Sequence, residues 1–509
     1  MIINPKLYEI NTRVWVKRFG SNVTLSQVPK NVFEELSNKG IKIIWLMGIW
    51  QTCSSTIEKC GFEPELLSSY NRSLKDWSKS DVIGSPYSID EYVVNPALGS
   101  WEELIELKKY LNSIGIKLFV DFVSNHFSAD SKYVQTNPEI FLKADEEFFL
   151  GDSFTFFKPD ANPKNIYAHG RDPFFPAWTD TIQINFFSLE ARKFMTDILL
   201  KLTDVCDGVR CDMAMLPLNN VFQNTWLGVL NKFGFSRPDA EFWKNAISLV
   251  KRKNSEFIFL GEAYWDLEWN LQQLGFDYTY DKRLTERLAS NDILGVKAHL
   301  HAEKPFQYKS VRFLENHDEQ RAITKFGKHR SLAAATVIST IQGMKFYYDG
   351  QFEGRKNKLP VQLGREPEEK ICVGIKDYYD KLLAITKAEI FQKGEWSMME
   401  PLTIGYGNRS HENFFAWQWI LNDERRIIVI NYSYSTSQCR LKLDIKHDKK
   451  KITLIDLLTN ELYERWVEEV NNVGLYIELK GHQSHIFSIL TLFPPPIFLL
   501  IASSKYLPR

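Results

Sequence analysis

Short apolar runs alternate with amphipathic stretches over roughly the first 385 residues. The run Ile41–Trp50 is almost continuously apolar, as expected of a parallel strand that is covered on both faces. Ser100–Gly115 has a helical pattern, because Ser100 and Glu103 form a capping box and Gly115 ends the periodicity. The strand-like runs of this region are Leu7–Val16, Ile41–Trp50, Ile116–Phe122, Gly208–Ala214, Glu256–Gly261, Ser310–Leu314 and Met344–Tyr348.

We interpret this alternation as eight βα steps, which predicts an α/β fold with a closed (β/α)8 TIM barrel at 1–385. The pattern lapses at 127–180, a stretch too long for an ordinary βα connection. We therefore predict a short inserted domain there. Its many aromatic residues, Phe174, Phe175 and Trp178 among them, are expected to form mainly a small core, with one or two available to stack on sugars.

The hydrophobic pattern changes from about Trp396, where short apolar runs are separated by polar turns. This pattern is typical of an antiparallel β-sandwich, which we place at 390–490 with a last strand at Ser484–Leu490. The tail 491–509 is apolar at first but is broken by three successive prolines, so it does not predict a membrane span. Its role is not indicated.

Composition narrows the class of partner. Lys plus Arg and Asp plus Glu both number 63, so the net charge is zero and gives no reason to expect nucleic acid or an anionic membrane. Six cysteines in 509 residues are too few for a disulfide scaffold, and the first residues do not resemble a signal peptide. We expect reduced thiols and a cytoplasmic location. The oligomeric state is not indicated.

Four polar segments follow predicted strands directly: Asp121–His126, Gly208–Ala214, Phe259–Ala263 and Phe313–Asp318. Barrel enzymes carry their active sites at the carboxyl ends of the strands. The sequence therefore delivers carboxylates, imidazoles and a guanidinium to one rim.

Within these segments, Arg210 and Asp212 lie two apart on a strand and point the same way. We expect the guanidinium to lower the pKa of Asp212 and keep it ionised. Glu262 follows an apolar run, which favours a raised pKa and a general-acid role. Asp318 adds a third carboxylate. Retaining glycosidases need two such carboxyl groups about 5 Å apart, which facing strand ends can provide.

In this order, the four segments resemble the four sequence regions of the α-amylase family of glycoside hydrolases. Ser85–Tyr92, Gln183–Asn185 and Tyr347–Gln351 are similar to further signatures of that family. The resemblance implies a catalytic barrel, an inserted domain B and a C-terminal β-sandwich. It also implies an oligosaccharide or polysaccharide substrate.

The family resemblance assigns the catalytic roles. Asp212 would be the nucleophile that forms a covalent glycosyl-enzyme intermediate. Glu262 would protonate the leaving oxygen and then deprotonate the acceptor. Asp318 would bind ring hydroxyls and favour the oxocarbenium-like transition state.

The resemblance also assigns substrate-binding residues. Arg210 would orient the nucleophile, His126 and His317 would hydrogen-bond the sugar at the cleavage point, and Tyr87 would stack on it. Asp121 would support the site structurally.

One segment departs from the family pattern, and one residue leaves open whether the protein binds calcium. Met213–Leu216 replaces the Lys-His pair that many amylases carry after the nucleophile, which alters acceptor-side binding. Asn125 matches a calcium ligand of some members, but no carboxylate cluster accompanies it. We predict no metal site and no cofactor, with a structural calcium left open.

The sequence thus predicts a retaining glycoside hydrolase that cleaves α-glucosidic bonds, α-1,4 bonds first among them, in malto-oligosaccharides or α-glucans. A glucanotransferase or a disaccharide isomerase could use the same intermediate, since no residue decides between water and sugar as acceptor. A non-catalytic sugar-binding relative is the remote alternative.

Overall fold

The computed structural model describes residues 2–446 and 450–490. The chain divides after Lys387 into two compact units. This boundary falls between residue 385, where the barrel was predicted to end, and residue 390, where the sandwich was predicted to begin. The predicted tail 491–509 lies outside the described residues.

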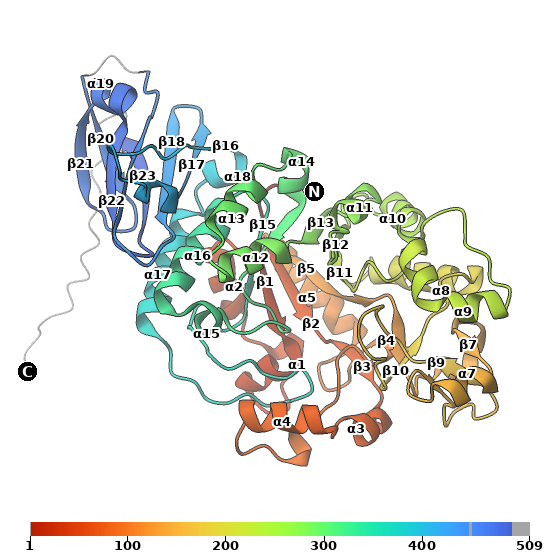
Figure 1. Ribbon diagram of the computed structural model, residues 1–509. Coiled ribbons are helices and arrows are strands. Elements are labelled where there is room, and N and C mark those ends of the chain that lie inside the picture. The colour runs from red at the N-terminus through yellow and green to blue at the C-terminus, as the bar shows by residue number, and fades with distance from the viewer. Residues whose placement is uncertain (1, 447–449, 491–509) are drawn as a thin grey trace, which may run out of the picture. The chain divides into compact units, whose positions relative to one another are not determined.

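The first unit is built on a closed barrel of eight strands, ordered β1-β15-β14-β13-β12-β11-β5-β2 with parallel pairing throughout (Figure 1). This confirms the predicted fold class. The barrel strands are β1 (Lys6–Asn11), β2 (Ile43–Met47), β5 (Lys117–Val123), β11 (Gly208–Asp212), β12 (Ile258–Gly261), β13 (Tyr278–Tyr280), β14 (Ser310–Arg312) and β15 (Met344–Tyr348).

Two strands differ from the sequence prediction. The run Leu7–Val16 is strand only as far as Asn11, after which the chain turns into the short helix α1 (Thr12–Trp15). The strand β13 was not among the predicted runs, because three residues are too few to show a periodicity. Tyr278 and Tyr280 nevertheless point into the barrel core, where both are fully buried.

Helices surround the barrel in sequence order (Figure 1). In α5, Ser100 and Glu103 form the predicted capping box, since Glu103 N–H donates to Ser100 Oγ over 3.2 Å and Ser100 N–H donates to Glu103 Oε2 over 2.7 Å. The longer helices of this unit are α2 (Lys30–Asn38), α4 (Pro64–Ser73), α5 (Trp101–Ser113), α8 (Leu189–Leu202), α9 (Asn219–Lys232), α10 (Phe242–Lys253), α12 (Lys282–Ala289), α13 (Ile293–Leu300), α16 (Lys328–Thr340) and α17 (Val373–Ile385).

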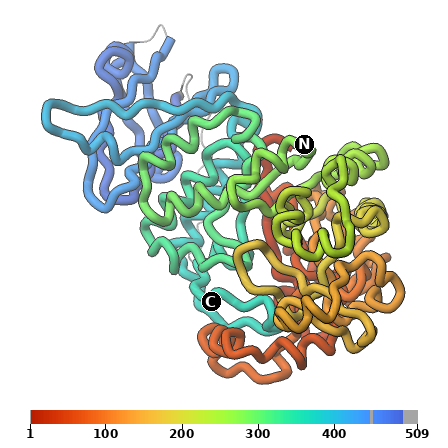
Figure 2. Tube along the Cα trace, turned by 45° about the vertical axis from the view of Figure 1, so that its right-hand side comes forward, coloured from red at the N-terminus to blue at the C-terminus, as the bar shows by residue number. Residues whose placement is uncertain are grey.

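The predicted insertion leaves the barrel after β5. Its base is the antiparallel pair β6 (His126–Ser128) and β10 (Thr181–Gln183), and its centre is a small sheet of β7 (Lys143–Ala144), β9 (Ile166–Ala168) and β8 (Phe156–Phe157). The insertion lies next to α3 (Ser54–Cys60) and α4 in both views (Figures 1 and 2), and Thr179 Oγ1 donates a hydrogen bond to Glu63 Oε1 over 2.9 Å. The insertion thus forms one wall above the carboxyl ends of the strands.

The second unit contains the predicted antiparallel sandwich. A six-stranded sheet, ordered β16-β17-β18-β23-β20-β21, packs its apolar face with the two-stranded sheet β19-β22 around a shared core. Its strands are β16 (Glu395–Met398), β17 (Phe414–Leu421), β18 (Glu424–Asn431), β19 (Ser437–Leu441), β20 (Lys451–Asp456), β21 (Leu462–Trp466), β22 (Leu475–Leu479) and β23 (Ser484–Leu490). Across the described part of both units, no helix is long and apolar enough to cross a membrane.

Gly208 offers a test of the barrel packing. A Cβ atom at this position of β11 would lie 2.5 Å from Phe119 Cε1 and 2.6 Å from the Ile258 carbonyl oxygen. We expect Gly208→Ala to destabilise the barrel by about 1–3 kcal/mol, because well-packed cores accept extra atoms only with strain. Thermal unfolding followed by circular dichroism measures this. Gly151→Ala is the matched control, since a Cβ there would meet no atom within 4 Å; equal melting temperatures for the two variants would contradict the expectation.

Candidate active site

The side chains predicted from the four segments converge at the carboxyl end of the barrel. Asp121 lies in β5, and Arg210 and Asp212 lie in β11. Glu262 follows the last residue of β12 directly, and His317 lies a few residues beyond β14. Because the strands are parallel, their ends share one rim and these groups meet there.

Arg210 contacts two of the predicted catalytic carboxylates at once. Its Nη1 lies 2.6 Å from Asp212 Oδ1, and its Nη2 lies 2.8 Å from Glu262 Oε2. The Arg210 side chain is fully buried, and the rings of Trp45 and Tyr87 lie 5.1 and 5.4 Å from its Cζ. One guanidinium therefore fixes the relative position of both carboxyl groups.

The pKa of Asp212 differs from the sequence prediction. Burial raises it above the ordinary value of an aspartate, and the contact with Arg210 opposes this shift without cancelling it. The prediction that Arg210 would lower this pKa considered the charge but not the desolvation. Burial also raises the pKa of Glu262, although Arg210 acts to lower it. The raised pKa is the direction predicted for Glu262.

Two further donors hold the Glu262 carboxyl. The backbone N–H of Met213 donates to Oε2 over 2.8 Å, and the Tyr264 hydroxyl donates to Oε1 over 2.8 Å. Met213 has a positive φ of 42°, a conformation uncommon for a residue with a side chain. The residue after the proposed nucleophile thus orients the proposed acid through its backbone, which explains how methionine can stand at this position.

His317 contacts both Asp318, the third carboxylate, and the ring of Tyr87. Its Nε2 lies 2.9 Å from Asp318 Oδ2 and 2.8 Å from the Tyr87 hydroxyl, and its ring stacks on that of Tyr87 at 5.5 Å. Partial burial would raise the pKa of Asp318, but the positive charge of His317 outweighs it and lowers the pKa below the ordinary range. The half-exposed Asp318 is therefore held ionised.

Glu9 contacts the same imidazole from β1 and was not among the site residues predicted from the sequence. Its Oε1 lies 2.5 Å from His317 Nδ1, and the residue is fully buried. The signal was a single carboxylate inside the apolar run Leu7–Val16. A charged residue inside a buried strand is rarely left without a partner, so this position merited selection.

Asp121 lies below the site, as the resemblance implied. Its carboxylate accepts hydrogen bonds from Trp45 Nε1 over 3.1 Å and from the backbone N–H of Gly48 over 2.7 Å. Burial raises its pKa to about 7. These contacts tie β5 to β2 and to the loop after it.

His126 lies at the start of β6, and its ring centroid is 5.2 Å from that of Trp178 in the insertion. Burial lowers the pKa of His126 to about 3, so its imidazole is neutral at ordinary pH. A neutral imidazole can donate one hydrogen bond and accept another, which suits a sugar hydroxyl.

A cavity of about 540 Å³ opens over the carboxylates and is lined by Glu262, Asp318, Met213 and Tyr264, among others. Asp212 lies deeper, with 10% of its side chain exposed. The cavity is large enough for a small-molecule ligand. The strand ends thus form the floor of a site that a sugar can enter.

The aromatic residues of the insertion divide into a buried and an exposed group, in line with the expected small core that leaves one or two rings available. Tyr167 and Phe156 are buried, whereas Phe174 and Phe175 are 68% and 65% exposed. Asp172 holds both phenylalanines in a tight turn at the surface, because its Oδ1 accepts hydrogen bonds from their backbone N–H groups. The Phe174 ring lies 5.0 Å from that of Trp265, edge to face.

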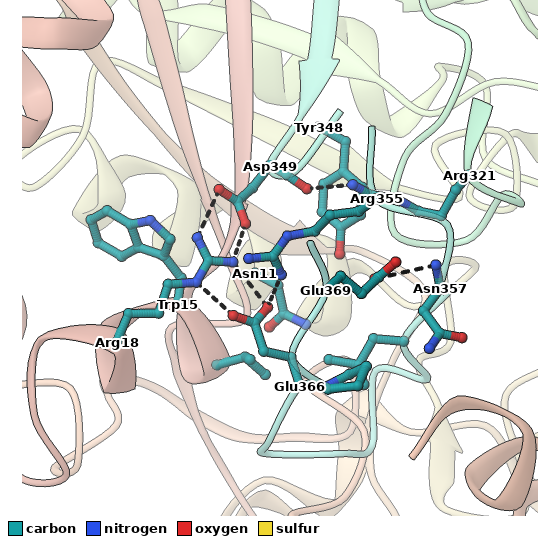
Figure 3. A pocket seen from close by; sticks show the side chains of 13 residues that line it. Asn11, Trp15, Arg18, Arg321, Tyr348, Asp349, Arg355, Asn357, Glu366 and Glu369 are labelled. Carbon is teal, nitrogen blue, oxygen red and sulfur yellow. Dashed lines mark hydrogen bonds and ion pairs between the residues drawn. The ribbon is translucent and has the colours of Figure 1, made fainter. Parts of the chain in front are cut away.

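A second, much smaller cavity of about 30 Å³ marks the seam where β1 and β15 close the barrel (Figure 3). Arg18 contacts Asp349 Oδ2 at 2.5 Å and Glu366 Oε1 at 2.6 Å, and Arg355 contacts Glu366 Oε2 at 2.5 Å. Tyr8 of β1 also donates to Asp349 Oδ1 over 3.0 Å. These ion pairs fix the carboxyl end of β1, the strand that carries Glu9.

Asn125 is paired with Gln183 through its side-chain amide. Its Oδ1 accepts from Gln183 Nε2 over 2.9 Å, and its Nδ2 donates to Gln183 Oε1 over 3.2 Å. A cation at this position would share the Asn125 oxygen with the Gln183 amide. Within residues 2–446 and 450–490, no group of three or more histidine, cysteine, aspartate or glutamate side chains has the arrangement of a metal site.

The chain is similar to known proteins in both sequence and fold. The family model of the α-amylase catalytic domain matches residues 34–381. The chain is 22% identical over 294 residues to α-amylase 3 of Dictyoglomus thermophilum, which covers 55% of each chain. It is 25% identical over 251 residues to α-amylase MalA of Haloarcula japonica, which covers 48% of this chain and 32% of that protein. The chain thus spans about half or less of these curated relatives.

Among solved structures, a maltogenic α-amylase, AmyB of Thermotoga neapolitana, matches with a TM-score of 0.66 at 20% identity. The match covers 95% of this chain and 98% of that one. At this identity the likeness concerns the fold. It includes both the barrel and the C-terminal sandwich.

The amide–amide pair generates a prediction about metal dependence. We expect chelation with EDTA, or addition of calcium chloride, to leave the melting temperature unchanged, because the Asn125 oxygen is already hydrogen-bonded to Gln183 and no metal-binding group of side chains accompanies it among the described residues. Asn125→Ala is expected to cost about 1–3 kcal/mol through the loss of both side-chain hydrogen bonds to Gln183. Gln183→Ala is expected to cost more, because Gln183 Nε2 also donates to the carbonyl oxygens of Asn125 and Ile184, each over 3.0 Å. A fall in melting temperature on chelation would contradict this account.

Proposed function

The chain belongs to the α-amylase family, and from that premise we propose that it is a retaining glycoside hydrolase acting on α-glucosidic bonds. Its substrates would be malto-oligosaccharides or α-glucans, cleaved at α-1,4 bonds. The observation that carries the proposal is the contact of one buried guanidinium, that of Arg210, with both Asp212 and Glu262. This arrangement suits the close spacing of about 5–5.5 Å that retaining enzymes need between their carboxyl groups.

In the first step of the proposed reaction, Asp212 attacks the anomeric carbon and forms a covalent glycosyl ester while Glu262 protonates the leaving oxygen. Glu262 lines the cavity and has a raised pKa, both of which suit a general acid. Asp212 lies deeper, where it can be reached by a sugar that has entered fully.

In the second step, Glu262 takes a proton from the incoming acceptor, which attacks the ester and releases Asp212. Asp318 is ionised and half-exposed, so it can accept hydrogen bonds from ring hydroxyls and favour positive charge on the sugar. His126 and Tyr87 would bind the same sugar. We place the enzyme in the cytoplasm, because all six cysteines are free thiols and suit a reducing compartment.

Asp212→Asn tests the proposal. We expect it to lower kcat on maltoheptaose by at least about a thousand-fold, because no covalent ester can form. Asp204→Asn, an exposed carboxylate paired with Lys253, is the matched control and should retain activity. Chromatography of products from starch, pullulan, maltotriose, sucrose and trehalose would define the substrate. Unchanged activity of Asp212→Asn would instead favour a non-catalytic role or another nucleophile.

A glucanotransferase is the second candidate, and the exposed aromatic rim favours it. Phe174, Phe175 and Trp265 offer ring faces beside the cavity that Glu262 lines. Aromatic faces bind sugar rings and exclude water, so they would favour a sugar as the acceptor. A disaccharide isomerase would retain both sugar units within the same cavity.

Trp265→Ala tests whether the acceptor is water, as in hydrolysis, or a sugar, as in transfer. We expect this variant to lower the ratio of transfer to hydrolysis by at least about five-fold, since stacking contacts of this kind contribute about 1 kcal/mol or more. The ratio is measured as chains longer than maltoheptaose against glucose and shorter chains. Leu150→Ala, an exposed apolar residue of the insertion outside the cavity lining, is the control. If wild type forms no longer chains, the transferase candidate fails.

A further inference from the structure

Glu9 is a fully buried carboxylate with an unusual set of contacts. Its Oε1 lies 2.5 Å from His317 Nδ1, whereas its Oε2 has no hydrogen-bond partner among the described residues. Such a half-satisfied carboxylate is costly in a low-dielectric interior unless a positive charge faces it. The imidazole of His317 is the group in direct contact.

His317 has a carboxylate on each side. Burial raises the pKa of Glu9, whereas the contact with His317 and the charge of Arg210 oppose this shift and favour the ionised form. An ionised Glu9 only accepts hydrogen bonds, so Nδ1 carries the proton between the two groups. On the other side of the ring, Nε2 lies 2.9 Å from Asp318 Oδ2 and 2.8 Å from the Tyr87 hydroxyl. With a proton on both nitrogens, the ring is an imidazolium between Glu9 and Asp318.

We propose that Glu9 is a positioning residue of the active site, whose negative charge keeps His317 doubly protonated so that His317 holds Asp318 ionised and oriented toward the cavity. Glu9 itself touches no substrate in this account. The inference rests on the proposed function, because it assigns Glu9 a part in placing Asp318 for the same reaction.

The charges around His317 agree in sign with this role. Burial lowers the pKa of His317, but Asp318 and Glu9 together more than reverse this effect and raise the pKa well above its usual range. The charged and titratable groups that interact with the imidazole are Glu9, Asp318, Tyr87, Asp121 and Asp212, and Arg210 acts in turn on Glu9 and Asp318. Asp212 has Arg210 as its direct counter-ion, which leaves Glu9 and Asp318 as the carboxylates in contact with His317.

Removing the charge of Glu9 has a defined consequence. In Glu9→Gln, the amide oxygen can still accept from Nδ1, so the geometry is kept while the negative charge is lost. The pKa of His317 then falls, because one of its two anionic partners is gone and burial remains. Above the new pKa, Nε2 loses its proton and no longer donates to Asp318.

The decisive measurement is the protonation state of His317 by ¹⁵N NMR on histidine-labelled protein, with its signal identified by its absence in His317→Gln. In wild type we expect both nitrogens to stay protonated well above the ordinary histidine pKa of about 6.5. In Glu9→Gln we expect the ring to titrate near or below that value. A neutral His317 in wild type at pH 7 would overturn the inference without any variant.

Kinetics give the second readout. We expect Glu9→Gln to lower kcat on maltoheptaose at least about ten-fold with little change in KM, and to move the alkaline limb of the pH profile to lower pH. Glu9→Asp keeps the charge and should restore part of the activity and of the alkaline limb. A purely structural role would lower the melting temperature and leave the shape of the pH profile unchanged, which would also overturn the inference.

Asp277→Asn is the matched control, because Asp277 is a buried carboxylate bound to the backbone N–H of Phe259 over 2.8 Å and to Lys251 at 2.9 Å, away from His317. It should leave the pH profile unchanged. Failure of the proposed function is separable, since that would appear as full activity in Asp212→Asn. Loss of activity in Asp212→Asn together with a wild-type profile in Glu9→Gln would overturn the Glu9 inference alone.

Discussion

The arrangement of the site depends on a fully buried guanidinium at the centre of the barrel mouth. A charge in that position is tolerated only if opposite charges and polarisable groups replace the water it has lost. Arg210 receives both, through Asp212, Glu262 and the surrounding aromatic rings. The two carboxyl groups are brought together because each is a partner of the same cation. The close approach of like charges, which would otherwise be unfavourable, is thereby a consequence of burying the arginine.

The second cation of the site follows the same logic on the opposite side of the barrel. His317 is buried between Glu9 and Asp318, as Arg210 is between Asp212 and Glu262. Each pair combines one group deep in the site with one that lines the cavity. Burial drives the carboxyl pKa values up and the two cations drive them down; the balance raises the pKa of Asp212 and Glu262 and lowers that of the half-exposed Asp318. This explains how three carboxylates in one small site can take three different roles.

Much of this architecture was predictable because it is local in the sequence. Buried parallel strands appear as apolar runs, the capping box of α5 is four residues long, and Arg210 and Asp212 lie on one strand. The features that escaped prediction are of two kinds. Some are too short to show a periodic pattern, such as the strand β13 and the turn at Asp172 that decides which phenylalanines are exposed. Others depend on contacts between distant segments, as when Glu9 meets His317 across 308 positions. The desolvation that raises the pKa of Asp212 is likewise a property of the assembled barrel.

The pairing of β1 with β15 has a consequence for the order of events during protein synthesis. The first strand pairs on one side with β2, but its other neighbour and the acidic partners of Arg18 come from residues 344–366. At ribosomal rates of about 5–20 residues per second, β1 would wait roughly 20–70 seconds for that neighbour. Throughout this interval one edge of β1 has no strand partner, and Glu9 has no imidazole to neutralise it until His317 has been made. The last side chains of the site and the strand that closes the barrel are therefore both made late in biosynthesis, and a chain that ends before His317 would lack both.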